Sequence, residues 1–191
     1  MTPRRARRAN AALTLRVELT GTAPLVWRRV ILNASDTFED LHGAIQLAMG
    51  WEDYHLHEFR VGELRIGIDD DEDDDGPETI DETTVSLADV LGENVGARFE
   101  YEYDFGDTWI HHLVLEAIEE LAVELEYPVC VAGERACPPE DSGGVSGFEE
   151  FLLVLSDPDH ARHGEYVRRA EGYDPTIFSV ARANASLQNP R

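Results

Sequence analysis

Leu13-Thr-Leu-Arg-Val-Glu-Leu19 alternates apolar and polar side chains along its whole length. A period of two residues is typical of a strand that buries one face and exposes the other. A turn-like segment, Thr20–Pro24, separates this stretch from a second apolar stretch, Val26–Leu32. The two stretches are therefore predicted to form an antiparallel hairpin, and the fold is predicted outward from it.

A helix is predicted directly after this hairpin, over Thr37–Met49. Its apolar residues recur at helical spacing, at Phe38, Leu41, Ile45 and Met49. Ser35 or Asp36 is expected to cap the start of the helix, and Gly50 is expected to end it, because these residue types favour those positions.

The remaining elements follow the same signals. Strands are predicted over Leu56–Ile68, Ala97–Asp104 and Trp109–Ala117, and Pro128–Gly144 is predicted to be a loop. Helices are predicted over Val85–Leu91, Gly147–Leu155, His160–Glu171 and from Pro175 or Thr176 to Leu187. Strands dominate the first two thirds and helices the last. This order predicts an α+β fold, with a mainly antiparallel sheet, a packed N-terminal helix and a helical C-terminal third.

The composition indicates a single acidic domain. The chain has 191 residues, of which 42% are hydrophobic, and its formal net charge is −23. Residues 11–191 are assigned to one domain, and residues 1–10 to a basic arm that is expected to be disordered. The acidic run Asp69–Asp75 predicts a solvated loop over residues 69–78. The overall charge disfavours non-specific binding to nucleic acid and favours cations, metals or basic partners.

Several classes of protein are disfavoured by what the sequence lacks. It contains no lysine, which excludes Schiff-base chemistry and the lysine of a P-loop. Two cysteines are too few for a disulfide framework. No stretch has the pattern of a signal peptide or the length of a membrane span, so a cytoplasmic location without a membrane partner is expected. The motifs GxSxG, GxGxxG and HExxH are also absent.

The densest group of polar and aromatic residues is Tyr101–His112. If Asp104, Asp107 and His111 converge at one end of the sheet, they offer ligands for a divalent metal or an acid–base set. Strand alternation places Trp109 and His111 on one face. The structural alternative is a hairpin turn with aromatic flanks, in which the aspartates serve the turn.

A second group lies in the Pro- and Gly-rich segment Cys130–Gly144. In the functional interpretation, its rigid backbone presents Glu140 and Asp141 as functional side chains. In the structural interpretation, these two residues cap the next helix or face solvent. A zinc site at Cys130 and Cys137 would need two or more further ligands.

Histidines form the third group. His55 and His57 would share one face of a strand if the strand begins early enough, and they are the candidates to complete a zinc site with the two cysteines. Histidines in such positions are more often structural than ligating. His42, on the first predicted helix, is expected to be structural.

Several motifs together resemble the plasmid pRiA4b ORF-3-like family. They are Val26-Trp-Arg-Arg-Val30, Leu41-His42, Gly50-Trp51 with His55-Leu-His-x-Phe59, Tyr103-Asp-Phe-Gly-Asp-x-Trp-x-His111, Ala136-Cys-Pro-Pro-Glu-Asp-x-Gly-Gly144, and Tyr173-Asp-Pro-x-x-Phe178 with Asn184. The resemblance runs from about Leu13 to Leu187.

That resemblance implies an α+β domain of bacteria, archaea and mobile elements, with no established reaction. Some members carry the label of a TnpR passenger protein of an insertion element. The shared motifs draw attention to Tyr103, Asp104, Asp107, Trp109, His111, Glu140 and Asp141. Relatives often have cysteine where this chain has Ser142, which weakens a cysteine-based metal site here.

Two hypotheses of function follow. The first is a binding or accessory module associated with mobile elements, with a protein partner and a ligand groove formed by Trp51, Tyr103 and Trp109. The alternative is a divalent-metal-dependent hydrolase of phosphoesters or nucleic acid. Its catalytic candidates are Asp104, Asp107, His111, Glu140 and Asp141, and its metal-ligand candidates are Asp107, His111, Glu140, His55, His57, Cys130 and Cys137. A third hypothesis, a partner that touches DNA through the basic arm, is opposed by the overall charge.

Overall fold

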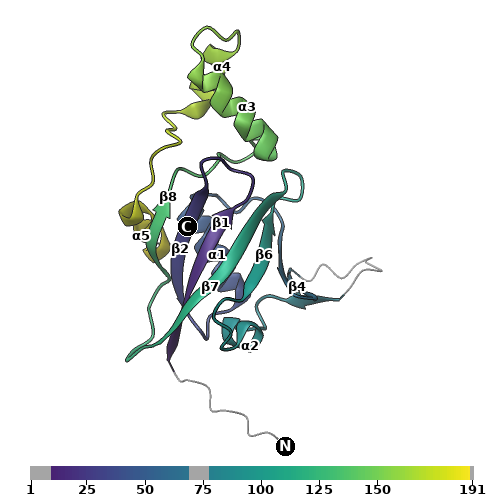
Figure 1. Ribbon diagram of the computed structural model, residues 1–191, viewed down its shortest axis with the longest axis vertical. Helices are drawn as coiled ribbons and strands as arrows, with labels where there is room; N and C mark the ends of the chain where they lie inside the picture. Colours follow the sequence, from purple (N-terminus) through teal and green to yellow (C-terminus); the bar gives the residue numbers. More distant parts are fainter. Residues whose placement is uncertain (1–9, 69–77, 190–191) are drawn as a thin grey trace, which may run out of the picture.

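An eight-stranded sheet forms the centre of the fold, in the order β5-β4-β3-β6-β7-β1-β2-β8 (Figure 1). The computed structural model describes residues 10–68 and 78–189. All neighbouring strands are antiparallel except β4 and β5, which are parallel. The strands are β1 (Ala11–Leu19), β2 (Val26–Asn33), β3 (His57–Val61), β4 (Leu64–Gly67), β5 (Thr79–Asp81), β6 (Arg98–Tyr103), β7 (Trp109–Glu120) and β8 (Val129–Glu134).

The helices lie around this sheet. They are α1 (Phe38–Met49), α2 (Leu87–Leu91), α3 (Gly144–Ser156), α4 (His163–Ala170) and α5 (Val180–Gln188). Helix α1 lies behind the sheet in Figure 1, α3 and α4 lie together beyond one end of it, and α5 lies beside β8. The predicted α+β class, with its antiparallel sheet, packed N-terminal helix and helical C-terminal third, is confirmed. Among the described residues, no helix has both the length and the apolar character needed to span a bilayer.

The predicted hairpin is the centre of the sheet. Strand β1 pairs with β2 in register Leu15↔Val30 and with β7 on its other side. The apolar residues of the alternating stretch, Leu13, Leu15, Val17 and Leu19, are all at most 1% exposed. Burial of one such side chain stabilises the fold by roughly 1.5–3 kcal/mol. The alternation therefore identified the inner face of the sheet, on which Leu41 and Ile45 of α1 are also buried.

The start of α1 differs from the prediction by one or two residues. Thr37, rather than Ser35 or Asp36, caps the helix, because the Thr37 side chain accepts from Asp40 N and the Asp40 side chain accepts from Thr37 N. The Asp36 carboxylate instead accepts from Asn33 N at the end of β2. The predicted stop at Gly50 is confirmed, with φ 95°.

Three predicted boundaries were wrong. Leu56–Ile68 is not one strand but the β3–β4 hairpin, because Gly62 turns the chain with φ 62°. The predicted loop Pro128–Gly144 begins with β8, which pairs with β2. The last helix begins at Val180, where the Ser179 side chain accepts from Arg182 N.

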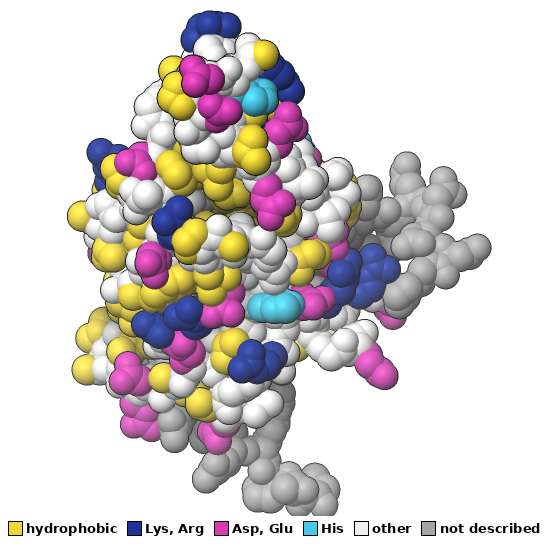
Figure 2. Space-filling view, turned by 45° about the horizontal axis from the view of Figure 1, so that its top comes forward, with side chains coloured by type: hydrophobic (Ala, Val, Ile, Leu, Met, Phe, Trp, Pro, Cys, Tyr) yellow, Lys and Arg dark blue, Asp and Glu magenta, His cyan; other side chains and the backbone are white. Residues whose placement is uncertain are grey.

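The face of the sheet opposite α1 carries ion pairs. Arg29 pairs with Glu116 across β2 and β7, and Arg60 of β3 pairs with Glu102 of β6. Figure 2 shows acidic and basic side chains lying next to one another on the visible face. The basic arm at residues 1–10, except Asn10, and the acidic loop at residues 69–78, except Glu78, fall outside the described residues.

Candidate functional site

The Tyr101–His112 motif forms the end of β6, a tight turn and the start of β7. Asp104 adopts φ 56°, and its Oδ1 accepts from Gly106 N at 2.9 Å and from Asp107 N at 3.2 Å. An aspartate side chain that accepts from the backbone ahead of it organises a turn. Asp104 therefore performs the role that the structural alternative gave it.

The second motif lies against this turn. Asp107 Oδ2 accepts from Gly143 N, the residue at the start of α3, at 2.9 Å. At Gly144, which has φ +66°, a Cβ would lie 2.5 Å from Asp107 O. Only glycine permits so close an approach. Asp107 therefore satisfies the backbone N–H at the N-cap of α3, the end of the helix at which Glu140 and Asp141 had been considered as caps.

Glu140 and Tyr103, one from each motif, hold the segment that follows α1. Glu140 Oε1 accepts from Glu52 N at 2.9 Å and from the Tyr103 hydroxyl at 3.1 Å. The same Tyr103 oxygen accepts from Tyr54 N at 3.0 Å. Residues 51–56 are thereby fixed to both motifs. We call this arrangement the segment clamp.

The three aromatic residues predicted to line a ligand groove lie in the interior. Trp51 is 5% exposed and Tyr103 and Trp109 are 0% exposed. The Trp51 ring stacks on Tyr103 with centroids 5.0 Å apart, and the Trp51 Nε1–H donates to Pro138 O. Burial raises the pKa of the Tyr103 hydroxyl. This geometry gives them a packing role, and their role as ligand contacts stays a prediction.

His111 also lies in the interior. Its Nδ1–H donates to Trp109 O at 3.0 Å, and burial lowers the pKa of the imidazole to about 4. Asp104 and Asp107 serve the turn, and His111 belongs to none of the potential metal-ligand groups in the described part of the chain. The expected convergence of these three residues is therefore wrong. Alternation correctly placed Trp109 and His111 on one face of β7, which is the core face.

The two cysteines do not join a metal-ligand group among residues 10–68 and 78–189. Cys130 and Cys137 are both buried free thiols, and burial raises the pKa of each. His55 and His57, the candidates to complete a zinc site with them, fall into two separate groups. The side chains that a cysteine-based zinc site requires are therefore not assembled around these thiols.

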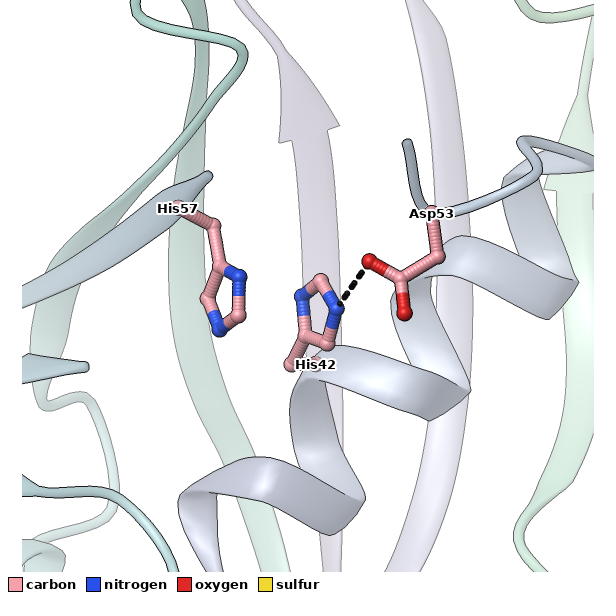
Figure 3. Close-up of side chains that lie close together, drawn as sticks. All are labelled: His42, Asp53 and His57. Atoms are coloured by element: carbon pink, nitrogen blue, oxygen red, sulfur yellow. Dashed lines mark hydrogen bonds and ion pairs between the residues drawn. The ribbon is translucent and has the colours of Figure 1, made fainter. Parts of the chain in front are cut away.

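The first of those groups is His42, Asp53 and His57, which we call the histidine pair site (Figure 3). His42 comes from α1, Asp53 from the segment after it, and His57 is the first residue of β3. The two imidazole rings stack with centroids 3.4 Å apart and 6° between their planes. His42 Nε2 lies 2.9 Å from Asp53 Oδ1, and the potential ligand atoms all lie within 4.8 Å of one another.

Each imidazole of the site is oriented by a further partner. His42 Nδ1 lies 2.8 Å from the Tyr101 hydroxyl, and the Gln46 side chain donates to the same hydroxyl at 2.9 Å. His57 Nε2 lies 2.7 Å from the buried Glu82 carboxylate. The remaining nitrogen, His57 Nδ1, is buried and has no hydrogen-bond partner within residues 10–68 and 78–189. Each ring therefore has one nitrogen held by an outer partner, Tyr101 or Glu82, while His42 Nε2 meets Asp53.

Burial makes the His42 ring a poor proton acceptor. It lowers the pKa of His42, and the neighbouring His57 lowers it further, against the opposing effect of Asp53. A neutral imidazole has a lone pair available for a metal. The sequence had indicated His57 as a candidate but His42 as structural, and it gave no signal for Asp53 or Glu82. Asp53 lies shortly before His57 in the chain and Glu82 lies further on, but neither shares a helix or strand with a histidine, so the fold brings them together.

A cavity of about 710 Å³ opens beside the histidine pair site. Its described lining is rich in carboxylates and histidines and contains no arginine: Glu39, His42, Gly43, Asp53, Tyr54, His55, Leu56, His57, Ile68, Asp81, Glu82 and Thr83. Ligand sites in proteins are typically cavities of this size. The electrostatic environment of this one favours neutral or cationic occupants.

The second group is His55, Asp104 and Asp141, which we call the loop cluster. His55 Nε2 lies 3.2 Å from Asp141 Oδ1 and 3.6 Å from Asp104 Oδ2. All three residues were candidates from the sequence, although His111 rather than His55 was expected beside Asp104. The structure thus brings the two long motifs together around a different histidine.

Comparison with known proteins confirms the resemblance seen in the motifs. The family model described as "Plasmid pRiA4b ORF-3-like protein" matches residues 11–182. The uncharacterized protein y4hQ of Sinorhizobium fredii is 38% identical over 94% of this chain and 92% of its own. The crystal structure of MM3350 from Methanosarcina mazei, a protein of unknown function, is 39% identical, with a TM-score of 0.79 over 90% of this chain and 97% of that one.

Proposed function

We propose that this chain, which belongs to the plasmid pRiA4b ORF-3-like family, is a divalent-metal-dependent hydrolase with its centre at the histidine pair site. One observation carries the proposal. His42 and His57 meet Asp53 beside a cavity, and the other nitrogen of each ring is already held by Tyr101 or Glu82. Metal-ligating histidines typically have such an outer partner, which fixes the ring and its tautomer.

The ligand set favours a transition metal. Two imidazole nitrogens and one carboxylate suit zinc and its neighbours in the first transition series, whereas magnesium and calcium prefer oxygen ligands. The ring lone pairs lie in the ring planes, so the stacked rings of His42 and His57 would tilt to face one ion. The Asp53 side chain is 58% exposed and is free to adjust with them.

Three protein ligands leave a coordination position for water. Zinc held by His42, Asp53 and His57 would lower the pKa of a bound water to about 7 and so would supply a nucleophile at neutral pH. The buried His57–Glu82 pair would hold the His57 ring while the ion is bound. The negative lining of the cavity supports a neutral or cationic small substrate. It does not favour the phosphoester or nucleic-acid substrates expected from the sequence.

Metal titration of the chelator-treated full chain tests this proposal. Cobalt(II) is a suitable probe, because its visible spectrum reports nitrogen coordination. Asp53→Asn and His57→Ala should weaken cobalt binding, while His112→Ala should not, because His112 lies on the opposite face of the sheet, next to Glu100. Unchanged binding and spectra in both site variants would refute the metal centre.

Turnover separates the hydrolase from a binding module. A panel of neutral and cationic esters and amides should be hydrolysed only by the metal-loaded chain, with loss of activity in Asp53→Asn. If metal binds at this site without any turnover, the binding or accessory module is the better interpretation. An association with mobile elements remains an expectation from the family resemblance alone.

A further inference from the structure

The atoms of the loop cluster lie close together but are not joined by a hydrogen bond, so a proton on His55 does not satisfy them. His55 Nε2 is buried and makes no hydrogen bond to any part of the chain that the structure describes, although Asp141 Oδ1 lies only 3.2 Å away. The neighbouring oxygens therefore surround the nitrogen without the alignment that an N–H donor requires. An arrangement of this kind is better suited to an ion among the ligands than to a simple histidine–aspartate hydrogen bond.

Asp104 contributes an oxygen that is already held in place. Its side chain is 10% exposed, and its Oδ1 accepts from the backbone of Gly106 and Asp107. The turn therefore fixes Asp104 Oδ2 toward His55, at 3.6 Å. A fixed ligand oxygen loses little conformational freedom when it binds an ion.

Glu140 adds a second unmet group beside the cluster. Its Oε1 takes two of the three hydrogen bonds of the segment clamp, from Glu52 N and the Tyr103 hydroxyl, while its Oε2 is buried without a partner among the described residues. Glu140 directly precedes Asp141 in the chain, so its carboxyl lies in the same loop as a member of the cluster. A buried carboxylate oxygen without a donor is unfavourable unless a cation offsets it.

We infer that the loop cluster is a second cation site, in which His55, Asp104 and Asp141 bind a divalent ion with Glu140 at its edge. One nitrogen and several carboxylate oxygens favour a harder ion than the histidine pair does, and manganese(II) is the class that fits this set. The two sites share no ligand. Asp53 and His55 lie on either side of Tyr54, so the segment clamp positions one ligand of each site.

Manganese(II) binding to the chelator-treated full chain tests the inference. Asp141→Asn is the informative variant, because the Asp141 side chain is 72% exposed and its loss should leave the fold intact. We expect it to weaken manganese binding by about tenfold or more, as loss of a charged ligand does. Glu149→Gln, which removes one exposed charge from α3, is the matched control and should change nothing.

The resonances of individual histidines identify the site. Substoichiometric manganese should broaden the His55 ring signals before those of His42 and His57. Equal affinity in Asp141→Asn and Glu149→Gln, or broadening confined to His42 and His57, would overturn the inference. Asp53→Asn keeps the two proposals apart: if it alone weakens metal binding, only the histidine pair site exists, and if Asp141→Asn alone does, only the loop cluster exists.

Discussion

Acid should destabilise this fold through His111. The imidazole is 0% exposed, and its polar contacts among the described residues are the Trp109 and Tyr101 carbonyl oxygens, 3.0 and 3.3 Å from Nδ1. Burial lowers the pKa of this group from 6.5 to about 4, and the positive charge of Arg28 acts in the same direction. The folded chain therefore resists a proton that the unfolded chain accepts readily.

The sign and size of the effect follow from this difference. Above pH 6.5 the ring is neutral in both states and contributes no pH dependence. As the pH falls below 6.5, the unfolded state binds the proton first, so the free energy of unfolding decreases by about 1.4 kcal/mol per pH unit. The decrease ends near pH 4, where the folded ring also accepts a proton. Between these limits the loss totals roughly 3 kcal/mol.

Urea unfolding at several pH values between 7 and 4, for the wild type and His111→Phe, measures this loss. Phenylalanine keeps an aromatic ring of similar size in the core but cannot titrate. The slopes are compared, since other groups, such as His42, contribute equally to both proteins. We expect the wild type to lose about 1.4 kcal/mol more per pH unit over the upper part of this range. Parallel pH profiles for the two proteins would refute the assignment.

Three further predictions concern other contacts. Gly144→Ala should lower the free energy of unfolding by about 1–3 kcal/mol, because its φ is positive and its Cβ would meet Asp107 O. The control Gly172→Ala also has a positive φ, but its Cβ would meet no neighbouring atom, so thermal melts of the two variants separate the clash from the backbone strain. Asn184→Ala should lower the free energy of unfolding by about 1–3 kcal/mol, because the Asn184 side chain bonds both N and O of Cys130 at the outer edge of β8. Hydrogen exchange should show faster amide exchange confined to β8 and α5. Metal at one hundred times its Kd should stabilise the fold by about 2.7 kcal/mol, and Asp53→Asn should lose this gain in calorimetry.

The sequence predicted elements well where one local pattern was sufficient. The alternation of Leu13–Leu19 and the helical spacing of Phe38–Met49 gave correct elements, because each pattern reflects burial against the same core. Strand β8 escaped prediction, since its pairing with β2 and the bonds from Asn184 come from distant segments. Gly62 was within a stretch of strand-forming residues, so the turn that it makes was not recognised.

The functional groups required the tertiary structure for a different reason. Strand alternation assigns side chains to faces but does not say which face meets the core. His111 was therefore as good a candidate for a metal ligand as His55. The residues that meet in the histidine pair site come from a helix, a loop and a strand, so no helical or strand period in the sequence predicts that they meet. Buried atoms without partners, such as His57 Nδ1 and Glu140 Oε2, are visible only in three dimensions.

The long motifs acquire a common role from these contacts. Glu140 accepts from Glu52 N and Tyr103 accepts from Tyr54 N. Asp104 N donates to Leu56 O at the end of the same segment. Asp53 and His55 are the residues in between, and each faces a different group of potential ligands. Because a metal site depends on ligand positions fixed within fractions of an ångström, holding this segment matters as much as supplying a ligand. The turn between β6 and β7, which Asp104 organises, therefore shapes the fold and, through the segment clamp, also determines where two possible ligands lie.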